Sequence, residues 1–340
     1  MDKHYFRLYA NCIPVRGYSR SSICDVQRGR LQFIPNDLFE ILEKHADRSI
    51  AEIIRIFGEE NRETIEEYFD FLCKEEYVFY CDFDDLKLFP DLDLSWDHPS
   101  IITNAIVDIG LESRYKFDSI IPQLEALGCK DIQFRFFRKT SIPELSEMMS
   151  LFRTSSIKSV ELLVPYSEDF TDAEITHFVE GNLRIHFLVF HSSPFRRQME
   201  TQSKTVIRFA EEIISDETHC GHISEGYFTI NLATFTESQK YNSCLNRKIA
   251  IDRNGDIKNC PSMRISYGNI KDNDIKGVLS NNSSFKEMWL INKDQIEICK
   301  DCEFRYICTD CRAYTVKKDS LSKPAKCAYD PYTAEWTDKR

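Results

Sequence analysis

The chain has 340 residues, a formal net charge of −11, and 29% charged against 42% hydrophobic (AVILMFWYC) residues. This length is sufficient for two or three domains, and the acidic balance argues against non-specific binding to nucleic acid or to an anionic membrane. The N-terminal MDKHYFRLYANC has no apolar signal-peptide core, and no apolar stretch is long enough to span a bilayer. We therefore expect a cytoplasmic protein with no nucleic acid and no membrane as partner.

Residues 1–95 are predicted to form a small module of their own. Strand-like runs at 4–15, 21–34 and 77–82 flank three helices at 36–46, 49–58 and 62–76. Asn36 and Ser49 are predicted N-caps, and Gly58 is the predicted end of the second helix. The layout resembles a winged helix-turn-helix, but acidic helices disfavour DNA as its partner. It is similar to the recognition element of enzymes that modify ribosomally made peptides, where a leader peptide adds a strand to the sheet edge.

Residues 100–217 alternate strand and helix patterns and predict an α/β region. Strands are expected at 101–110, 131–137, 158–166 and 183–190, and helices at 116–128, 141–153 and 171–180. The last two helices open with capping boxes, Ser141 with Glu144 and Thr171 with Glu174. Such repeats imply a parallel sheet, either open or curled into a partial barrel, because a complete eight-fold barrel needs about 250 residues.

The thirteen cysteines are divided unevenly along the chain. Those without short spacings are expected to be packing residues: Cys12, Cys24, Cys73, Cys81 and Cys129. Seven others are crowded into the C-terminal region: Cys244, Cys260, Cys299, Cys302, Cys308, Cys311 and Cys327. Thiols stay reduced in the cytoplasm, so this crowding favours metal or redox chemistry over disulfides.

The spacing in residues 218–340 is specific. The turn Asn254-Gly255 predicts a hairpin with Cys244 and Cys260 at the ends of its arms. Ten residues separate Cys244 from Gly255 and four more precede Cys260. With the cysteines that follow, this pattern resembles the SPASM domain of radical SAM peptide maturases, which implies two [4Fe-4S] clusters. One departure is that only two residues separate Cys308 from Cys311, where the family usually has three.

The resemblance implies how the ligands are shared. Cys299, Cys302, Cys308 and Cys327 would hold a distal cluster, and Cys244, Cys260 and Cys311 a proximal one. We predict Cys220 as the fourth proximal ligand; an open iron or a buried structural thiol at Cys220 are the alternatives. Arg305 and Arg312 are candidate hydrogen-bond donors toward the clusters. A zinc ribbon remains an alternative cofactor, although zinc needs only four of these thiols.

A radical SAM core should precede such a domain, but its cysteine motif is missing. The loop at 108–117 has no cysteine, and no two cysteines are separated by three residues. We interpret 100–217 as a degenerate, radical-SAM-like partial barrel that does not bind S-adenosylmethionine.

The whole pattern resembles the SPASM-domain maturase of grasp-with-spasm systems. That resemblance implies peptide maturation with a precursor peptide, its leader bound by residues 1–95, and an ATP-grasp ligase as partners. Three hypotheses stay open: a peptide-modifying maturase without a radical SAM cluster, a non-catalytic adaptor that presents the precursor to the ligase, and a zinc-ribbon-type binding protein.

Overall fold

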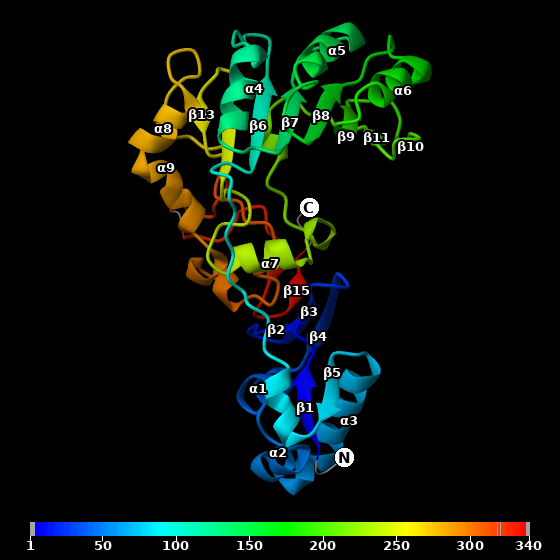
Figure 1. Cartoon of the computed structure of the whole chain (residues 1–340), viewed down its shortest axis with the longest axis vertical. Coiled ribbons are helices and arrows are strands. Elements are labelled where there is room, and N and C mark those ends of the chain that lie inside the picture. Colours follow the sequence, from blue (N-terminus) through cyan, green and yellow to red (C-terminus); the bar gives the residue numbers. More distant parts are fainter. Residues whose placement is uncertain (1–3, 318, 320, 338–340) are drawn as a thin grey trace.

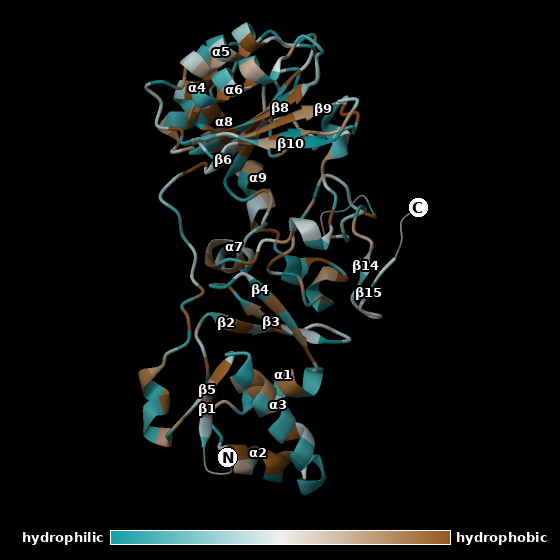
Figure 2. Cartoon of the chain, turned by 90° about the vertical axis from the view of Figure 1, so that its right-hand side faces the viewer, coloured by the Kyte–Doolittle hydropathy of each residue, from teal (hydrophilic) through white to brown (hydrophobic). Residues whose placement is uncertain are grey.

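The computed structural model describes residues 4–317, 319 and 321–337, arranged in three tiers along the long axis (Figure 1). A large sheet with helices forms one end, a helix-and-sheet module at the N-terminus forms the other, and the cysteine-rich region lies between them (Figures 1 and 2). Across these described residues, no helix combines the length and the apolar character needed to cross a membrane.

The N-terminal module consists of two small antiparallel sheets and three helices. Its elements are β1 (Tyr5–Leu8), β2 (Cys12–Val15), β3 (Ser21–Asp25), β4 (Arg30–Ile34), α1 (Asn36–Lys44), α2 (Ile50–Phe57), α3 (Arg62–Lys74) and β5 (Val78–Cys81). β1 pairs with β5, and β2, β3 and β4 form a three-stranded sheet. The first two strand-like runs of the sequence each hold two strands, the first divided by a turn from Tyr9 to Cys12, and the third run holds β5 alone.

The helix boundaries in this module test the predicted caps. Ser49 forms a complete capping box with Glu52 at the start of α2, and Gly58 ends that helix with φ of 99°. The prediction for Asn36 is wrong, because Pro35 occupies the N-cap position of α1. The Asn36 side chain instead bonds Ser21 Oγ at 2.6 Å and the Tyr18 carbonyl at 2.7 Å.

The large sheet has eight strands in the order β10-β11-β9-β8-β7-β6-β12-β13. Its strands are β6 (Asn104–Ile109), β7 (Asp131–Phe136), β8 (Ser159–Pro165), β9 (Ile185–His191), β10 (Arg197–Glu200), β11 (Val206–Phe209), β12 (Lys248–Ile251) and β13 (Ile257–Lys258). The six inner strands run parallel, and β10 and β13 are antiparallel edges. This confirms the predicted parallel α/β sheet.

Three helices cover one face of this sheet: α4 (Phe117–Ala126), α5 (Ile142–Ser150) and α6 (Asp172–Glu180) (Figure 2). Thr171 and Glu174 form the predicted capping box at α6. At α5, Ser141 accepts from the Glu144 backbone, but the Glu144 carboxylate bonds Arg138 and Thr140 instead of completing the box.

Side chains alternate between the two faces of the sheet, and this alternation directs three polar side chains away from the helices. Val107, Phe134 and Ile249 belong to the helix-covered core. Their neighbours Asp108, Arg135 and Lys248 therefore lie on the opposite face, which is the one nearer the cysteine-rich region.

The cysteine-rich region has little regular structure besides α7 (Leu232–Ser238), α8 (Ile275–Asn281), α9 (Ser283–Glu287), β14 (Tyr329–Asp330) and β15 (Glu335–Trp336). The predicted hairpin is present as β12 and β13, and β12 joins the large sheet beside β6.

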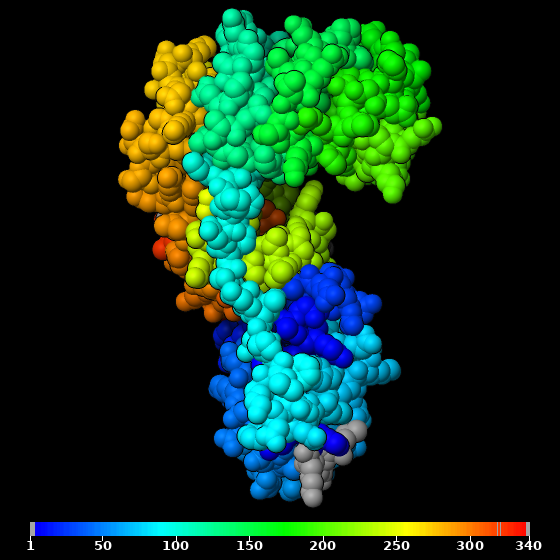
Figure 3. All heavy atoms as spheres, viewed as in Figure 1, coloured from blue at the N-terminus to red at the C-terminus, as the bar shows by residue number. Residues whose placement is uncertain are grey.

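Two connections join the N-terminal module to the rest. The β2–β4 sheet packs on the cysteine-rich region, with Val15 and Cys24 in one apolar cluster with Phe304 and Ile307. The linker after β5 then runs over the surface to β6 (Figure 3).

Candidate metal centres

None of the thirteen cysteines forms a disulfide. The scattered five are placed as packing predicts: Cys12, Cys24 and Cys129 are buried, and Cys73 and Cys81 are half-buried. Cys24 lies in β3 and Cys73 in α3, as expected from their surroundings in the sequence.

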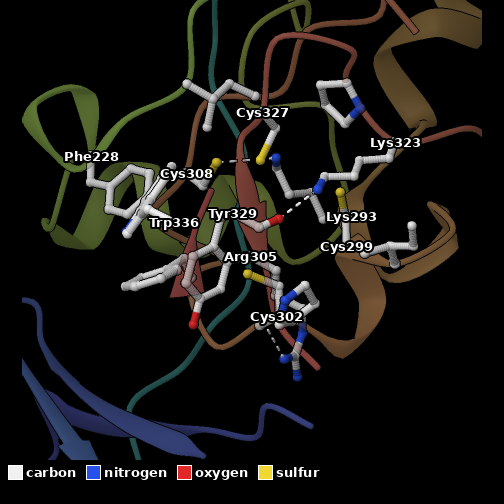
Figure 4. Close-up of a pocket in the computed structure, with 15 residues that line it drawn as sticks. Phe228, Lys293, Cys299, Cys302, Arg305, Cys308, Lys323, Cys327, Tyr329 and Trp336 are labelled. Carbon is white, nitrogen blue, oxygen red and sulfur yellow. Dashed lines mark hydrogen bonds between the residues drawn. The ribbon is translucent and has the colours of Figure 1, made fainter. Parts of the chain in front are cut away.

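Four cysteines line one narrow cavity, and we name them the distal set: Cys299, Cys302, Cys308 and Cys327 (Figure 4). The rest of the lining is mostly apolar, and the rings of Phe228, Tyr329 and Trp336 gather on one side. About 20 Å³ of free space remains between these side chains. A bound cluster would therefore be shielded from solvent, and the lining would have to move outwards to admit it.

Tight turns bring the distal thiols together. The Cys302 amide donates to the Cys299 carbonyl at 3.0 Å, and the Cys308 amide donates to the Phe304 carbonyl at 2.9 Å. Ile298, directly before Cys299, has φ of 69°, a conformation that a β-branched residue rarely adopts. Cys327 comes from a later loop, held by a backbone bridge to Ile223.

Four other cysteines line a second cavity of about 310 Å³, and we name them the proximal set: Cys220, Cys244, Cys260 and Cys311. In the β12–β13 hairpin Ala250 pairs with Lys258, so Cys260 comes opposite Lys248, and Cys244 lies four residues before Lys248. Polar and aromatic residues complete this lining: His219, His222, Tyr227, Ser262, Thr309 and Tyr314. Cys220 is the exposed member of the set.

Gly221 explains how the Cys220 segment approaches Cys311. A Cβ on Gly221 would lie 2.9 Å from Cys311 Sγ, closer than real Cβ atoms come. Gly221 also has φ of +89°, which glycine adopts without strain. The segment thus makes a close backbone approach to a thiol of the proximal set.

The structure therefore gathers the eight candidate cysteines into two groups of four. Among residues 4–317, 319 and 321–337, no three His, Cys, Asp or Glu side chains form a group that could hold a single metal ion. Four thiolates are the donor set that a [4Fe-4S] cluster takes, so the donor chemistry of each cavity fits such a cluster.

Burial sets the protonation of the thiols. It raises the pKa of Cys299 to about 11 and that of Cys260 to about 12. It also raises the pKa of Cys302, Cys308 and Cys311. Thiols are the stable form without metal, and cluster binding must release their protons.

Two lysines that the sequence analysis did not identify contact the thiols. Lys293 Nζ donates to Cys308 Sγ at 3.3 Å, and Lys248 Nζ donates to Cys244 Sγ at 3.5 Å. Burial lowers the pKa of each lysine, but the neighbouring sulfurs in their thiolate form, and for Lys293 also the Asp310 carboxylate, outweigh burial and raise the pKa of both. Lys248 lies four residues after Cys244, whereas Lys293 lies fifteen residues before Cys308, so only the first contact is between near neighbours in the sequence.

The two predicted arginine donors have protein partners, and Arg305 also lines the distal cavity. Arg312 is buried and donates to the Asp310 carboxylate at 2.6 Å and to the Ser322 carbonyl at 2.8 Å. Arg305 donates to Asp294 and to the Cys302 carbonyl.

A buried ion pair lies where the missing cysteine motif would begin. Asp108 in β6 accepts two hydrogen bonds from Arg135 in β7, at 2.6 and 2.7 Å, and both side chains are about 2% exposed or less. Burial raises the pKa of Asp108 to about 6, although Arg135 opposes this shift. The carboxylate is ionised at neutral pH. The thiols of Cys220 and Cys260 lie near enough to act on the charge of Arg135.

Comparison with known proteins bears on the cysteine-rich region. Residues 243–303 match the family model of SPASM, an iron-sulfur cluster-binding domain. This part of the chain is similar to that domain. The match includes Cys244, Cys260, Cys299 and Cys302 and ends before the last three cysteines.

The other comparisons add little. No curated protein matches the sequence. Among solved structures, the chain is similar to SuiB from Streptococcus suis bound to precursor peptide SuiA, with 11% identity and a TM-score of 0.35, covering 95% of this chain and 98% of that one. A TM-score this low does not establish a shared fold.

Proposed function

We propose that the protein is an iron-sulfur protein for the maturation of a ribosomally made peptide, and that it works without cleaving S-adenosylmethionine. The observation that carries this proposal is the division of eight cysteines between two cavities, four thiols to each. The SPASM match of residues 243–303 supports iron-sulfur chemistry over a zinc ribbon.

The distal set would hold one [4Fe-4S] cluster and the proximal set, with Cys220 as its fourth ligand, a second. Such clusters supply one-electron transfer or, at an iron with an exchangeable ligand, Lewis-acid binding. The narrow, mostly apolar distal cavity leaves little room for a substrate and suits electron transfer. The wider proximal cavity, with exposed Cys220, gives a substrate group more access.

The Asp108–Arg135 pair supports the absence of S-adenosylmethionine chemistry. A radical SAM core needs three thiolates in the loop after its first strand, and here the last residue but one of that strand, Asp108, is a carboxylate bound to the buried guanidinium of Arg135. We propose that 100–217 is a degenerate radical-SAM-like region that contributes structure to the proximal site.

The N-terminal module would recognise the leader of the precursor peptide. We propose that residues 1–95 form a winged-helix-like unit, with 218–340 as the SPASM domain. β4 is an edge of the three-stranded sheet, and an added strand there would pair through backbone hydrogen bonds. Phe33 of β4 lies against Phe304, with ring centroids 5.6 Å apart, so a leader on this edge would lie close to the distal set. An ATP-grasp ligase as partner and a cytoplasmic location follow from the family resemblance alone.

The deciding experiment is anaerobic purification followed by analysis of iron, sulfide and zinc. We expect about eight irons and eight sulfides per chain, as two four-iron clusters require. Stoichiometric zinc with negligible iron would refute the proposal. Formation of 5′-deoxyadenosine from S-adenosylmethionine by the reduced protein would refute the degenerate-core interpretation.

A reconstitution separates the maturase from the adaptor. Precursor peptide and ligase are combined with the cluster-loaded protein or with protein from which iron has been removed. A modification that needs the protein and its iron supports a maturase. Ligase product that needs the protein but not its iron supports an adaptor.

A further inference from the structure

Each thiol set contains one lysine whose ammonium group donates to a cysteine sulfur. In the distal set Lys293 Nζ lies 3.3 Å from Cys308 Sγ, and in the proximal set Lys248 Nζ lies 3.5 Å from Cys244 Sγ. Lys293 belongs to the short turn Lys293–Gln295, whereas Lys248 begins β12. Two unrelated elements thus supply the same contact, once to each set.

The surroundings hold both ammonium groups in place. Lys293 is 5% exposed, and its Nζ also donates to the Thr309 carbonyl at 3.3 Å and lies 3.9 Å from Asp310 Oδ1. Lys248 lies on the sheet face turned away from the helices, and its backbone is fixed by pairing with Asn104 in β6. Neither contact comes from a freely rotating surface side chain.

A cation beside a ligand sulfur changes the energy of a cluster's two oxidation states. When [4Fe-4S]2+ takes one electron from a low-potential donor and becomes [4Fe-4S]+, no bond breaks and the assembly gains one negative charge. A buried positive charge and a hydrogen bond to sulfur stabilise the reduced form more than the oxidised form. The same ammonium in water would be screened and have less effect.

We propose that Lys293 and Lys248 set the reduction potentials of the distal and proximal clusters, each through one N–H···S hydrogen bond that favours the reduced form. The proposal rests on the proposed function, because it requires a cluster in each set. In this proposal the two lysines are not cluster ligands. They stabilise the added negative charge of the reduced cluster.

The test is a mediated redox titration of the anaerobically purified protein, monitored by electron paramagnetic resonance. Lys293→Met and Lys248→Met keep the length of the side chain but remove its charge and donors. Each should lower the midpoint potential of a different one of the two clusters. We expect at least a tenfold change in the ratio of reduced to oxidised cluster, about 59 mV for one electron. Lys→Arg variants at the same positions should lie closer to the unmodified protein.

Two nearby lysines provide matched controls. Lys323 lines the distal cavity but donates to the Tyr329 carbonyl at 2.5 Å, and Lys326 donates to the Thr218 and Cys220 carbonyls. Lys323→Met and Lys326→Met remove a positive charge near each set without removing an N–H···S hydrogen bond. Their shifts should be clearly smaller.

The possible negative results can be told apart by the iron content and the midpoint potentials. Unchanged potentials in both variants at full iron content would overturn the proposal, as would equal shifts in the controls. Loss of the cluster from both Lys→Met variants would also overturn it, because the lysines would then hold the site together rather than tune it. An unmodified protein without iron would overturn the proposed function and this inference together, whereas bound iron with unmoved potentials would overturn this inference alone.

Discussion

Cys220 is the exposed thiol of the proximal set and precedes the other three in the sequence. Replacing it by alanine should remove one of four ligands, so Cys220→Ala is expected to lower the iron content or to change the spectrum of one cluster. Cys129→Ala is the control, because Cys129 is fully buried in the sheet core and remote from both cavities. Full iron with an unchanged spectrum in the Cys220 variant would indicate an open or differently ligated proximal iron.

A second prediction at the scale of single residues concerns the buried ion pair of Asp108 and Arg135. Asp108→Asn leaves the guanidinium of Arg135 buried without a counter-charge. Loss of one partner from a buried pair lowers the free energy of unfolding by about 3–5 kcal/mol. Equilibrium unfolding in urea measures this change.

The control for that change lies in the loop that follows β6. Glu112 pairs with Arg114 at 3.5 Å, with side-chain exposures of 87% and 62%. Glu112→Gln should therefore change the free energy of unfolding by about 0–1 kcal/mol. If both variants changed the free energy of unfolding equally, the buried pair would contribute no more to stability than an exposed pair does.

At the scale of elements, the turn around Gly221 positions the proximal set. Gly221→Ala combines an unfavourable positive φ with a contact of 2.9 Å to Cys311 Sγ. We expect this variant to lose up to half of its iron. Gly226→Ala is the matched control, since a Cβ there meets only Ser224 Oγ at 4.0 Å. The measurement is the iron content of both purified variants. Full iron content in Gly221→Ala would show that this turn is not needed for cluster binding.

The β12–β13 hairpin serves two structures at once. Its strands extend the large sheet, and its ends supply two thiols and Lys248 to the proximal set. Any change in the pairing of β12 with β6 would therefore move those thiols. The proximal site is thus coupled to the packing of the sheet and not only to its own loop.

At the scale of the whole molecule, the contacts between the N-terminal module and the distal site include one buried carboxylate. Glu303 is 1% exposed, directly follows Cys302, and accepts from Arg20 Nε at 2.7 Å. The β2–β4 sheet adds a hydrogen bond from Ser22 Oγ to the Glu303 carbonyl at 3.1 Å. The N-terminal module and the segment that carries the distal cysteines therefore share an interface.

Arg20→Ala tests this interface. It leaves the Glu303 carboxylate without its charged partner and should lower the free energy of unfolding by about 2 kcal/mol. We also expect faster proteolysis between the module and the cysteine-rich region. Arg48→Ala is the control, because Arg48 pairs with Asp47 at 3.6 Å and both side chains are more than half exposed. Similar stability of the two variants would contradict a role for Arg20 at the interface.

The sequence by itself determined features that depend on near neighbours. The parallel order of β6 to β9, the N-cap at Ser49, the capping box at Thr171 and the hairpin at Asn254-Gly255 are all coded by local periodicity, caps and turn residues. Where a local signal failed, a distant partner competed for the side chain: Asn36 bonds Ser21 and Tyr18, and Glu144 bonds Arg138.

Only the tertiary structure decided which thiols share a cavity and what surrounds them. Cys220 reaches Cys311 because Gly221 permits a close backbone approach, and Lys248 faces the thiols because β12 joins β6 in a fixed register. Lys293 and Cys308 meet across a loop, and Arg20 meets Glu303 across a module boundary. The spacing of cysteines in the sequence indicates which residues are candidate ligands. Contacts between distant segments form only when the whole core packs, so spacing alone does not predict them.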